Sequence, residues 1–119
     1  MNNNTIKNVS EDFLKHTPLS DFCYYRMFFG CTSLETAPEL PAASLTKGCY
    51  SYMFDGCSNL NYIKVGFTKW NDSYGIADYK STYSWVNNIA SIGTFECPKE
   101  LTIQTGISYV PEGWSVTTY

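Results

Sequence analysis

The sequence predicts an α/β fold: a short solenoid of stacked units in which parallel strands alternate with short helical turns, closed by a β-rich C-terminal cap. The nonapeptide "CYYRMFFGC" at residues 23–31 returns as "CYSYMFDGC" at residues 49–57. Residues 23–34 agree with residues 49–60 at seven of twelve positions. An L-x-x-L-x-L-like spacing of apolar residues follows each copy. A sequence that resembles itself at the separation between these two segments is typical of repeat folds, whose units bury their apolar sides by stacking.

One unit can be interpreted locally. "CYYRMFFGC" predicts a short helical turn with Cys23, Met27 and Phe28 on one face, and Gly30 can end it in a left-handed conformation. The strand then begins at Leu34 in "SLETAPELP", and the prolines of this stretch stiffen the return of the chain.

A second and a third unit follow, with the strand spacing at residues 60–65 and again at residues 92–97. We call the sequence separation between Leu34 and Leu60 the short offset. The separation between Leu60 and Ile92, which also aligns Met53 with Trp85, is the longer offset. The extra residues of the longer offset lie in "FTKWNDSYGIADYKS", which is typical of an inserted loop. "ELTIQTG" and "EGWSVTTY" predict strands, and "SEDFLKH" predicts a short helix capped by Ser10.

These assignments predict one domain over residues 1–119, with atypical ends that cover the stack. Its parts are an N-terminal cap and half repeat (1–22), repeat 1 (23–48), repeat 2 (49–65), an insertion loop (66–81), a degenerate repeat 3 (82–97) and a C-terminal β cap (98–119). The side chains expected in the core are Met27, Phe28, Leu34, Met53, Phe54, Leu60, Ile63, Trp85, Ile92 and Phe95.

A family resemblance rests on "MFFGCTSLETAPELPAASLTKGCYSYMFDGCSNL" and on the tail "WVNNIASIGTF…VPEGWSV". These segments resemble BspA-type leucine-rich repeats, of the kind found in surface proteins of gut Bacteroidetes and in virion proteins of their phages. The resemblance covers roughly residues 14–116, except for the insertion at 66–81. It implies a leucine-rich-repeat solenoid and adhesion or ligand binding on an outer surface, with no catalytic residues to carry over.

Composition narrows the function classes. The net charge of −3 and the scattered Lys and Arg residues argue against a nucleic-acid partner, which calls for a basic stripe. No apolar run approaches the roughly 20 residues of a membrane span, so no membrane insertion is expected. The start "MNNNTIKNVSEDF" lacks the apolar core of a signal peptide. We therefore expect a chain made in the cytoplasm, which is either incorporated into a virion or other larger particle or displayed on a surface after loss of a leader.

Cysteine and histidine usage argues against an enzyme and a metal site. Five cysteines cannot all pair within one chain, and their C-x7-C spacing fits no common zinc pattern. His16 is the only histidine, so a cysteine nucleophile lacks an evident base. We expect no cofactor, no metal and free buried thiols, with Cys23 beside Cys49 and Cys31 beside Cys57.

Candidate binding residues are those that differ between the units, because these positions face outward in a stack. On the strand face we expect a ladder of Thr36, Tyr62 and Thr94. The neighbouring candidates on this face are Glu35, Asn61, Lys64 and Glu96. The insertion loop adds three aromatic candidates, Trp70, Tyr74 and Tyr79, since aromatic residues are favoured at recognition surfaces.

The function expected from the sequence is a non-enzymatic protein- or glycan-binding module used in adhesion, as a phage virion or bacterial surface component. Two alternatives remain open: a small structural assembly subunit, and an intracellular phage-encoded inhibitor of a host protein. A short stack leaves strand edges at its ends, so we expect a homo-oligomer or a subunit of a larger assembly.

Overall fold

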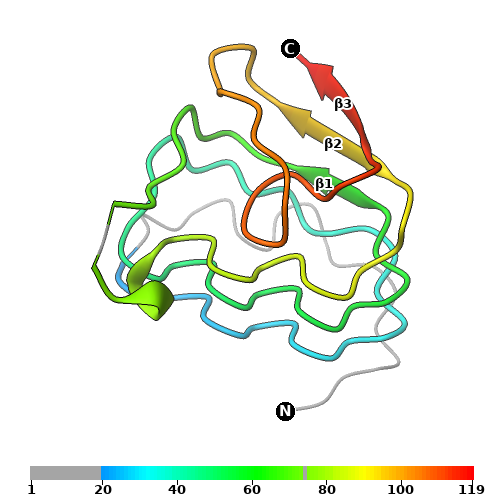
Figure 1. Ribbon diagram of the computed structural model, residues 1–119, viewed down its shortest axis with the longest axis horizontal. Helices are drawn as coiled ribbons and strands as arrows, with labels where there is room; N and C mark the ends of the chain where they lie inside the picture. The colour runs from blue at the N-terminus through cyan, green and yellow to red at the C-terminus, as the bar shows by residue number, and fades with distance from the viewer. Residues whose placement is uncertain (1–19, 74) are drawn as a thin grey trace.

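Regular secondary structure in the described part of this protein is a three-stranded parallel sheet with almost no helix (Figure 1). The computed structural model describes residues 20–73 and 75–119. Within them lie the strands β1 (Tyr62–Lys64), β2 (Thr94–Cys97) and β3 (Ser115–Thr118), in the sheet order β1-β2-β3, and one turn of 3-10 helix, η1 (Ala77–Tyr79). The helix expected from "SEDFLKH" lies outside the described residues.

The register of the sheet follows the two offsets found in the sequence. Tyr62 of β1 pairs with Thr94 of β2, as the longer offset requires, and an isolated parallel bridge joins Thr36 to Tyr62, as the short offset requires. β3 adds a further parallel strand, with Ser115 opposite Thr94. Parallel neighbours require a long crossover between them, so the chain must leave the sheet and return before each new strand.

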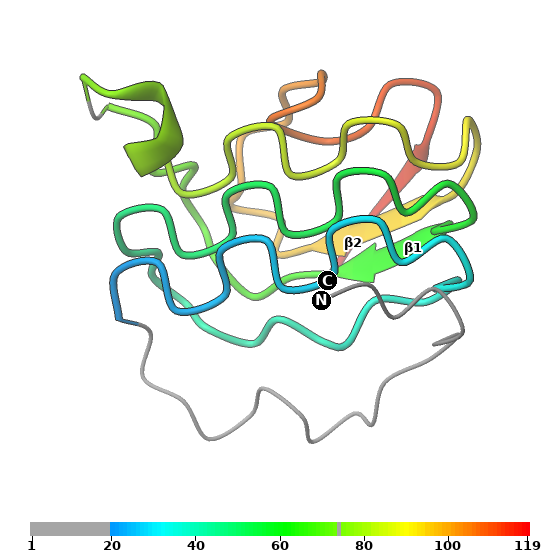
Figure 2. The ribbon, with the colours of Figure 1, turned by 90° about the horizontal axis from the view of Figure 1, so that it is seen from below.

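Away from the sheet, the chain forms three rows of consecutive turns. We call residues 21–30 the first row, residues 47–56 the second row and residues 81–88 the third row. The rows run side by side as the blue, green and yellow ribbons of Figure 1, and Figure 2 shows the same order from below. The two nonapeptides occupy the first two rows, so the repeated sequence occupies neighbouring positions in the structure.

Backbone hydrogen bonds hold each row to the next. Alternate amides close turns within a row, as the amide of Met27 donates to the carbonyl of Tyr24 at 3.1 Å. The amides between them donate to the following row, as the amide of Phe28 donates to the carbonyl of Met53 at 2.9 Å. Both sets of backbone donors are thereby satisfied, which a buried segment requires.

The nonapeptides are therefore not the helical turns expected from the sequence. A helix would use every amide within the segment, whereas here every second amide bonds to the neighbouring row. Arg26 and Tyr52 adopt φ values of 58° at equivalent positions of the two rows, and these left-handed residues interrupt a helical path. Pairing between rows has replaced every second hydrogen bond that a helix would make within the segment.

Gly30 and Gly56 end the first and second rows with φ values of +74° and +85°, and the left-handed conformation predicted for Gly30 is confirmed. Such values cost a glycine little because it has no Cβ. The two glycines also face each other: a Cβ added to Gly56 would lie 3.3 Å from the Cα of Gly30. The rows thus come close together where neither carries a side chain.

The core lies between the rows and the sheet, and aromatic side chains stack in it. The rings of Phe28 and Phe54 lie 5.9 Å apart and 5° from parallel, and the Tyr50 ring stacks on that of Trp85 at 6.1 Å. The radius of gyration is 12.8 Å, close to the ~13.5 Å of a compact chain of this length. Met27 is half-buried, and most of the other predicted core residues are buried as expected.

Ile92 is the exception, because its side chain is 74% exposed rather than buried. The indole of Trp114 occupies the neighbouring interior position. Its Nε1 donates to the carbonyl of Ala90 at 2.8 Å, and a Cβ added to Gly93 would lie 2.7 Å from the ring. A residue of the C-terminal segment therefore packs against the backbone of Gly93, beside the exposed Ile92.

The C-terminal segment also covers the open side of the third row. The amide of Val86 donates to the carbonyl of Ile107 at 3.1 Å, and that of Ser84 to the Oγ of Ser108 at 2.9 Å. The strand expected in "ELTIQTG" is not formed; this segment contributes only the isolated bridge of Thr105. Its backbone is used to cover the row instead of extending the sheet.

Candidate binding surfaces

The outer face of the sheet carries most of the strand residues predicted to bind a partner. We define the sheet face as Thr36, Tyr62, Lys64, Thr94, Glu96, Ser115 and Thr117, which the register aligns across neighbouring strands. All are half-buried or exposed. Ile63 and Phe95, which lie between them on β1 and β2, are completely buried. The alternation of strand side chains therefore separates this face from the core.

Glu35 and Asn61 extend the sheet face at the start of the strands. Both side chains are exposed. The amide of Asn61 donates to the carbonyl of Glu35 at 2.9 Å, and that of Thr94 donates to the carbonyl of Asn61 at 3.0 Å. The structure thus brings together all seven strand-side candidates, although they are dispersed over residues 35–96 of the sequence.

Polar side chains on the sheet face contact one another. The hydroxyl of Tyr62 donates a hydrogen bond to the carboxylate of Glu96. The Nζ of Lys64 lies 4.0 Å from the Glu39 carboxylate and 5.2 Å from the centre of the Tyr119 ring. These contacts limit the side-chain rotamers, so less conformational entropy is lost when a partner binds. Sequence reasoning missed Glu39, which lies within repeat 1, and Tyr119, which belongs to the C-terminal cap.

The surroundings of Tyr62 favour its protonated form. The pKa of Tyr62 is raised to about 12. Burial is the largest cause, followed by the hydrogen bond to Glu96 and the nearby carboxylate charges. Burial and the charge of Glu39 likewise raise the pKa of Tyr119. At neutral pH the face therefore offers neutral phenol groups beside an ammonium and two carboxylates.

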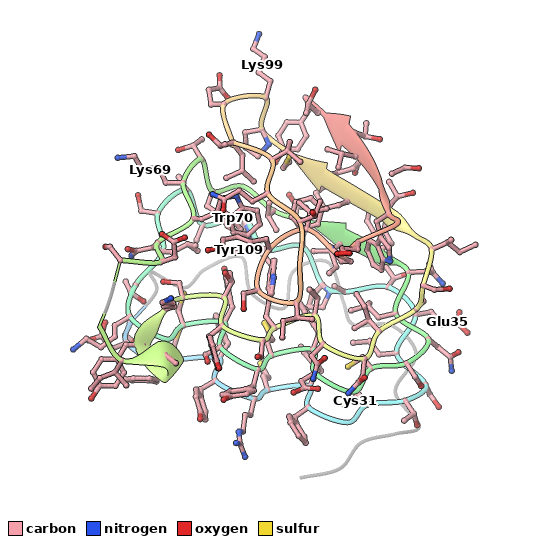
Figure 3. The ribbon with its side chains drawn as sticks, viewed as in Figure 1. Cys31, Glu35, Lys69, Trp70, Lys99 and Tyr109 are labelled. Carbon is pink, nitrogen blue, oxygen red and sulfur yellow. The ribbon has the colours of Figure 1, made fainter. Side chains whose placement is uncertain are left out.

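The insertion loop does not present its aromatic residues as predicted. Trp70 is only 8% exposed, and Figure 3 shows it turned inward beside Tyr109 while Lys69 points outward. Tyr79 is half-buried, between the Phe22 ring at 5.4 Å and the Nζ of Lys47 at 4.8 Å from its ring centre. Tyr74 lies outside the described residues. Trp70 therefore packs against residues inside the molecule and is not presented at the surface.

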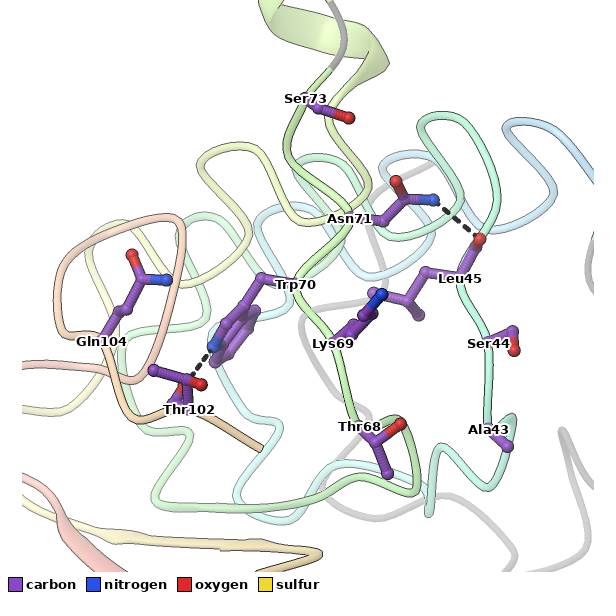
Figure 4. A pocket seen from close by; sticks show the side chains of 10 residues that line it. All are labelled: Ala43, Ser44, Leu45, Thr68, Lys69, Trp70, Asn71, Ser73, Thr102 and Gln104. Carbon is purple, nitrogen blue, oxygen red and sulfur yellow. Dashed lines mark hydrogen bonds between the residues drawn. The ribbon is translucent and has the colours of Figure 1, made fainter. Parts of the chain in front are cut away.

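A pocket lies where this loop meets two other segments (Figure 4). Its volume is about 530 Å³. It is lined by residues 43–45, residues 68–71 with Ser73, and the pair Thr102 and Gln104. It shares no residue with the sheet face, so the pocket and the sheet face are separate candidate surfaces.

A third surface is an aromatic cluster on the turn rows. The ring of Tyr52 lies 5.7 Å from that of Tyr25 and 5.5 Å from that of Tyr83, so one line of contacts crosses all three rows. The guanidinium of Arg26 lies 5.0 Å from the Tyr52 ring centre and 5.3 Å from that of Phe29. These tyrosines are diagonal neighbours, so the short and longer offsets of the sequence do not pair them.

Most of the cysteine side chains are buried. All five cysteines are free; Cys23 is half-buried and the others are buried. Burial raises the pKa of Cys57 to about 12, and its Sγ donates to the carbonyl of Phe28 at 3.0 Å. Burial also raises the pKa of Cys49. A thiolate is the reactive form, and these surroundings disfavour it.

The part of the chain that the structure describes contains no group of three or more His, Cys, Asp or Glu side chains placed to hold a metal ion. Those same residues include no helix with the length and apolar character needed to cross a bilayer.

Comparison with known proteins adds no relative: no protein-family model, curated protein or solved structure matches this chain.

Proposed function

We propose that this protein is a non-enzymatic recognition module, a short leucine-rich-repeat solenoid that binds a protein or glycan on an outer surface through its sheet face. The two stacked nonapeptide rows, and the parallel pairing of Thr36 with Tyr62 and of Tyr62 with Thr94, support the repeat interpretation. The setting proposed is a phage virion or a bacterial surface, as the resemblance to BspA-type repeats implies; an inhibitor inside a host cell is the alternative setting.

One observation carries the proposal: the sheet separates a buried face from an accessible polar and aromatic face. Ile63 and Phe95 are completely buried, whereas Tyr62, Lys64 and Glu96 beside them remain accessible. The accessible set combines a phenol with charges of both signs, and tyrosine is enriched at protein interfaces because one end is apolar and the other polar. Neighbouring strands hold these groups in a defined pattern that a partner can match.

The test is binding of fluorescently labelled protein to intact cells of gut Bacteroidetes. The double variant Tyr62→Ala, Lys64→Glu should bind at least about tenfold more weakly, because it removes an anchor and reverses a charge. The variant should lose some stability with the contacts to Glu96 and Glu39, but it should stay folded, since neither side chain lies in the core. Lys80→Glu, a charge reversal next to η1, serves as the matched control and should bind as the wild type does.

Two results would contradict the proposal. If the wild-type protein binds no cells, the adhesion function is wrong. If the double variant binds as tightly as the Lys80→Glu control, the sheet face is not the binding site.

A second function, that of an assembly subunit, is favoured by β3. This strand is at the edge of the sheet, and all four of its residues are exposed. The amides of Ser115 and Tyr119 donate toward β2, so by alternation those of Val116 and Thr118 point to the outer side. An uncovered edge of this kind can pair with a strand of another chain, so the proposal includes a homo-oligomer.

A further inference from the structure

The pocket beside the insertion loop is the feature that the proposed function leaves unused. Its volume of about 530 Å³ falls within the range of small-molecule sites, roughly 300–1,000 Å³. Three segments distant in sequence form its walls: residues 43–45, residues 68–71 with Ser73, and Thr102 with Gln104. A ligand held here would act independently of the sheet face, which shares none of these residues.

Hydrogen bonds between the walls hold the pocket in shape. The Nδ2 of Asn71 donates to the carbonyl of Leu45 at 2.8 Å, and the Nε1 of Trp70 donates to the carbonyl of Thr102 at 2.7 Å (Figure 4). Each bond joins the loop to a different wall. The Oδ1 of Asn71 can then serve as an acceptor for a ligand. A ligand therefore meets walls that are already ordered, which reduces the entropy lost on binding.

The indole of Trp70 is held from behind by other rings. It stacks on Phe95 at 6.2 Å and 25°, and meets the edges of Phe67 and Tyr109 at 5.2 Å each. Trp70 and Leu45, each 8% exposed, contribute a small apolar surface to the pocket. The rest of the lining consists mainly of hydroxyl and amide side chains.

The charge of the pocket is opposite in sign to that of the chain, whose net charge is −3. Among the described residues that line the pocket, Lys69 is the one charged side chain and none is Asp or Glu. Lys69 is exposed and points outward from the loop (Figure 3). A cationic ligand would meet no compensating charge from this lining, whereas one carboxylate would find an ammonium.

We infer that this pocket binds a sugar residue bearing a carboxylate, such as a uronic acid unit of a glycan. The ammonium of Lys69 pairs with the carboxylate, and the side chains of Thr68, Asn71 and Gln104 exchange hydrogen bonds with ring hydroxyls. The apolar edge of the sugar ring contacts Trp70. Sugars combine a ring of hydroxyls with a small apolar face, and the lining offers a counterpart to each.

The experiment is an NMR titration of the whole chain with three probes: D-glucuronate, D-glucose and acetate. The reporter is the indole N–H signal of Trp70, with that of Trp114, which is bonded to Ala90 and lines no part of the pocket, as reference. Glucuronate should shift the Trp70 signal with a dissociation constant on the order of 1 mM, as expected for a ligand of its size. Glucose, which lacks the carboxylate, and acetate, which lacks the sugar ring, should each bind at least about tenfold more weakly.

The variant Lys69→Gln keeps much of the length of the side chain and removes its charge. It should weaken glucuronate binding at least about tenfold and leave glucose binding unchanged, because only the carboxylate contact is lost. The control Lys99→Gln, at an exposed lysine outside the pocket, should bind glucuronate like the wild type. Matching backbone NMR spectra of both variants would show that the fold is intact.

Four outcomes would overturn the inference. Acetate binding as tightly as glucuronate would make the pocket a simple anion site, and glucose binding as tightly would remove the role of the carboxylate. A Trp70 signal unaffected by glucuronate, or equal effects of Lys69→Gln and Lys99→Gln, would mean that the pocket does not bind this class of sugar. None of these outcomes bears on the cell-binding test of the sheet face.

Discussion

Phe54 is the side chain whose truncation should most directly test the stacking of the rows. It lies in the second row, is completely buried, and contacts a ring of each neighbouring row: Phe28 at 5.9 Å and Trp85 at 6.1 Å. Its backbone amide also donates to the Trp85 carbonyl at 3.0 Å. Phe54→Ala leaves this backbone bond intact and removes only the side chain between the rows.

The expected loss is roughly 3–5 kcal/mol of unfolding free energy, the usual cost of truncating a buried phenylalanine. Burial of the side chain accounts for about 1.5–3 kcal/mol, and each aromatic contact adds about 0.5–1.5 kcal/mol. A small domain has about 5–15 kcal/mol in total, so the variant should be marginally stable. With a urea dependence of about 1–3 kcal/mol per M, the midpoint should fall by on the order of 2 M.

Asp55→Ala is the matched control, because Asp55 is the next residue of the same row and its side chain is half-buried rather than buried. It should cost less than about 1 kcal/mol. Urea unfolding followed by tryptophan fluorescence measures both variants. Equal shifts of the two midpoints would refute the reasoning, since they would mean that the inner and outer faces of the row are wrongly assigned.

Three further predictions concern pH, thiols and assembly. Tyr62 has a higher pKa in the folded protein than in the unfolded chain, so its protonated form stabilises the fold fully below pH 10, and this contribution is lost as the pH rises from 10 toward 12. The difference in urea midpoint between the wild type and Tyr62→Phe should therefore shrink between pH 9 and pH 11. A constant difference would contradict this prediction. A thiol reagent should react slowly with the native protein and then label five cysteines per chain in denaturant without reductant, whereas fewer than five would indicate a disulfide. Sedimentation should show an oligomer that Thr118→Pro dissociates, because proline removes an outward amide of β3; an unchanged mass would exclude this edge as the contact.

The sequence by itself determined the repeat offsets and most of the core. Cys, Met, Phe and Gly recur at fixed positions of the two nonapeptides, and a side chain that must contact its own equivalent in the next row is constrained in every copy. The stacked rings of Phe28 and Phe54 are the direct result. The same argument placed Thr36, Tyr62 and Thr94 on one ladder, because strand residues alternate between faces and the offsets set the register.

Only the tertiary structure decided how the rows form and where the aromatic residues outside the repeat lie. The nonapeptide has the residue spacing of a helical turn, but its alternate amides find acceptors in the adjacent row, and no local pattern encodes that partner. Trp70 stands among polar residues in the sequence and is nevertheless buried, because Phe95 and Tyr109 arrive from distant segments to enclose it. Ile92 is exposed, whereas Trp114 from the C-terminal segment is buried against the neighbouring Gly93. Repetition predicts the contacts between equivalent residues, whereas contacts between non-equivalent residues depend on how the whole chain packs.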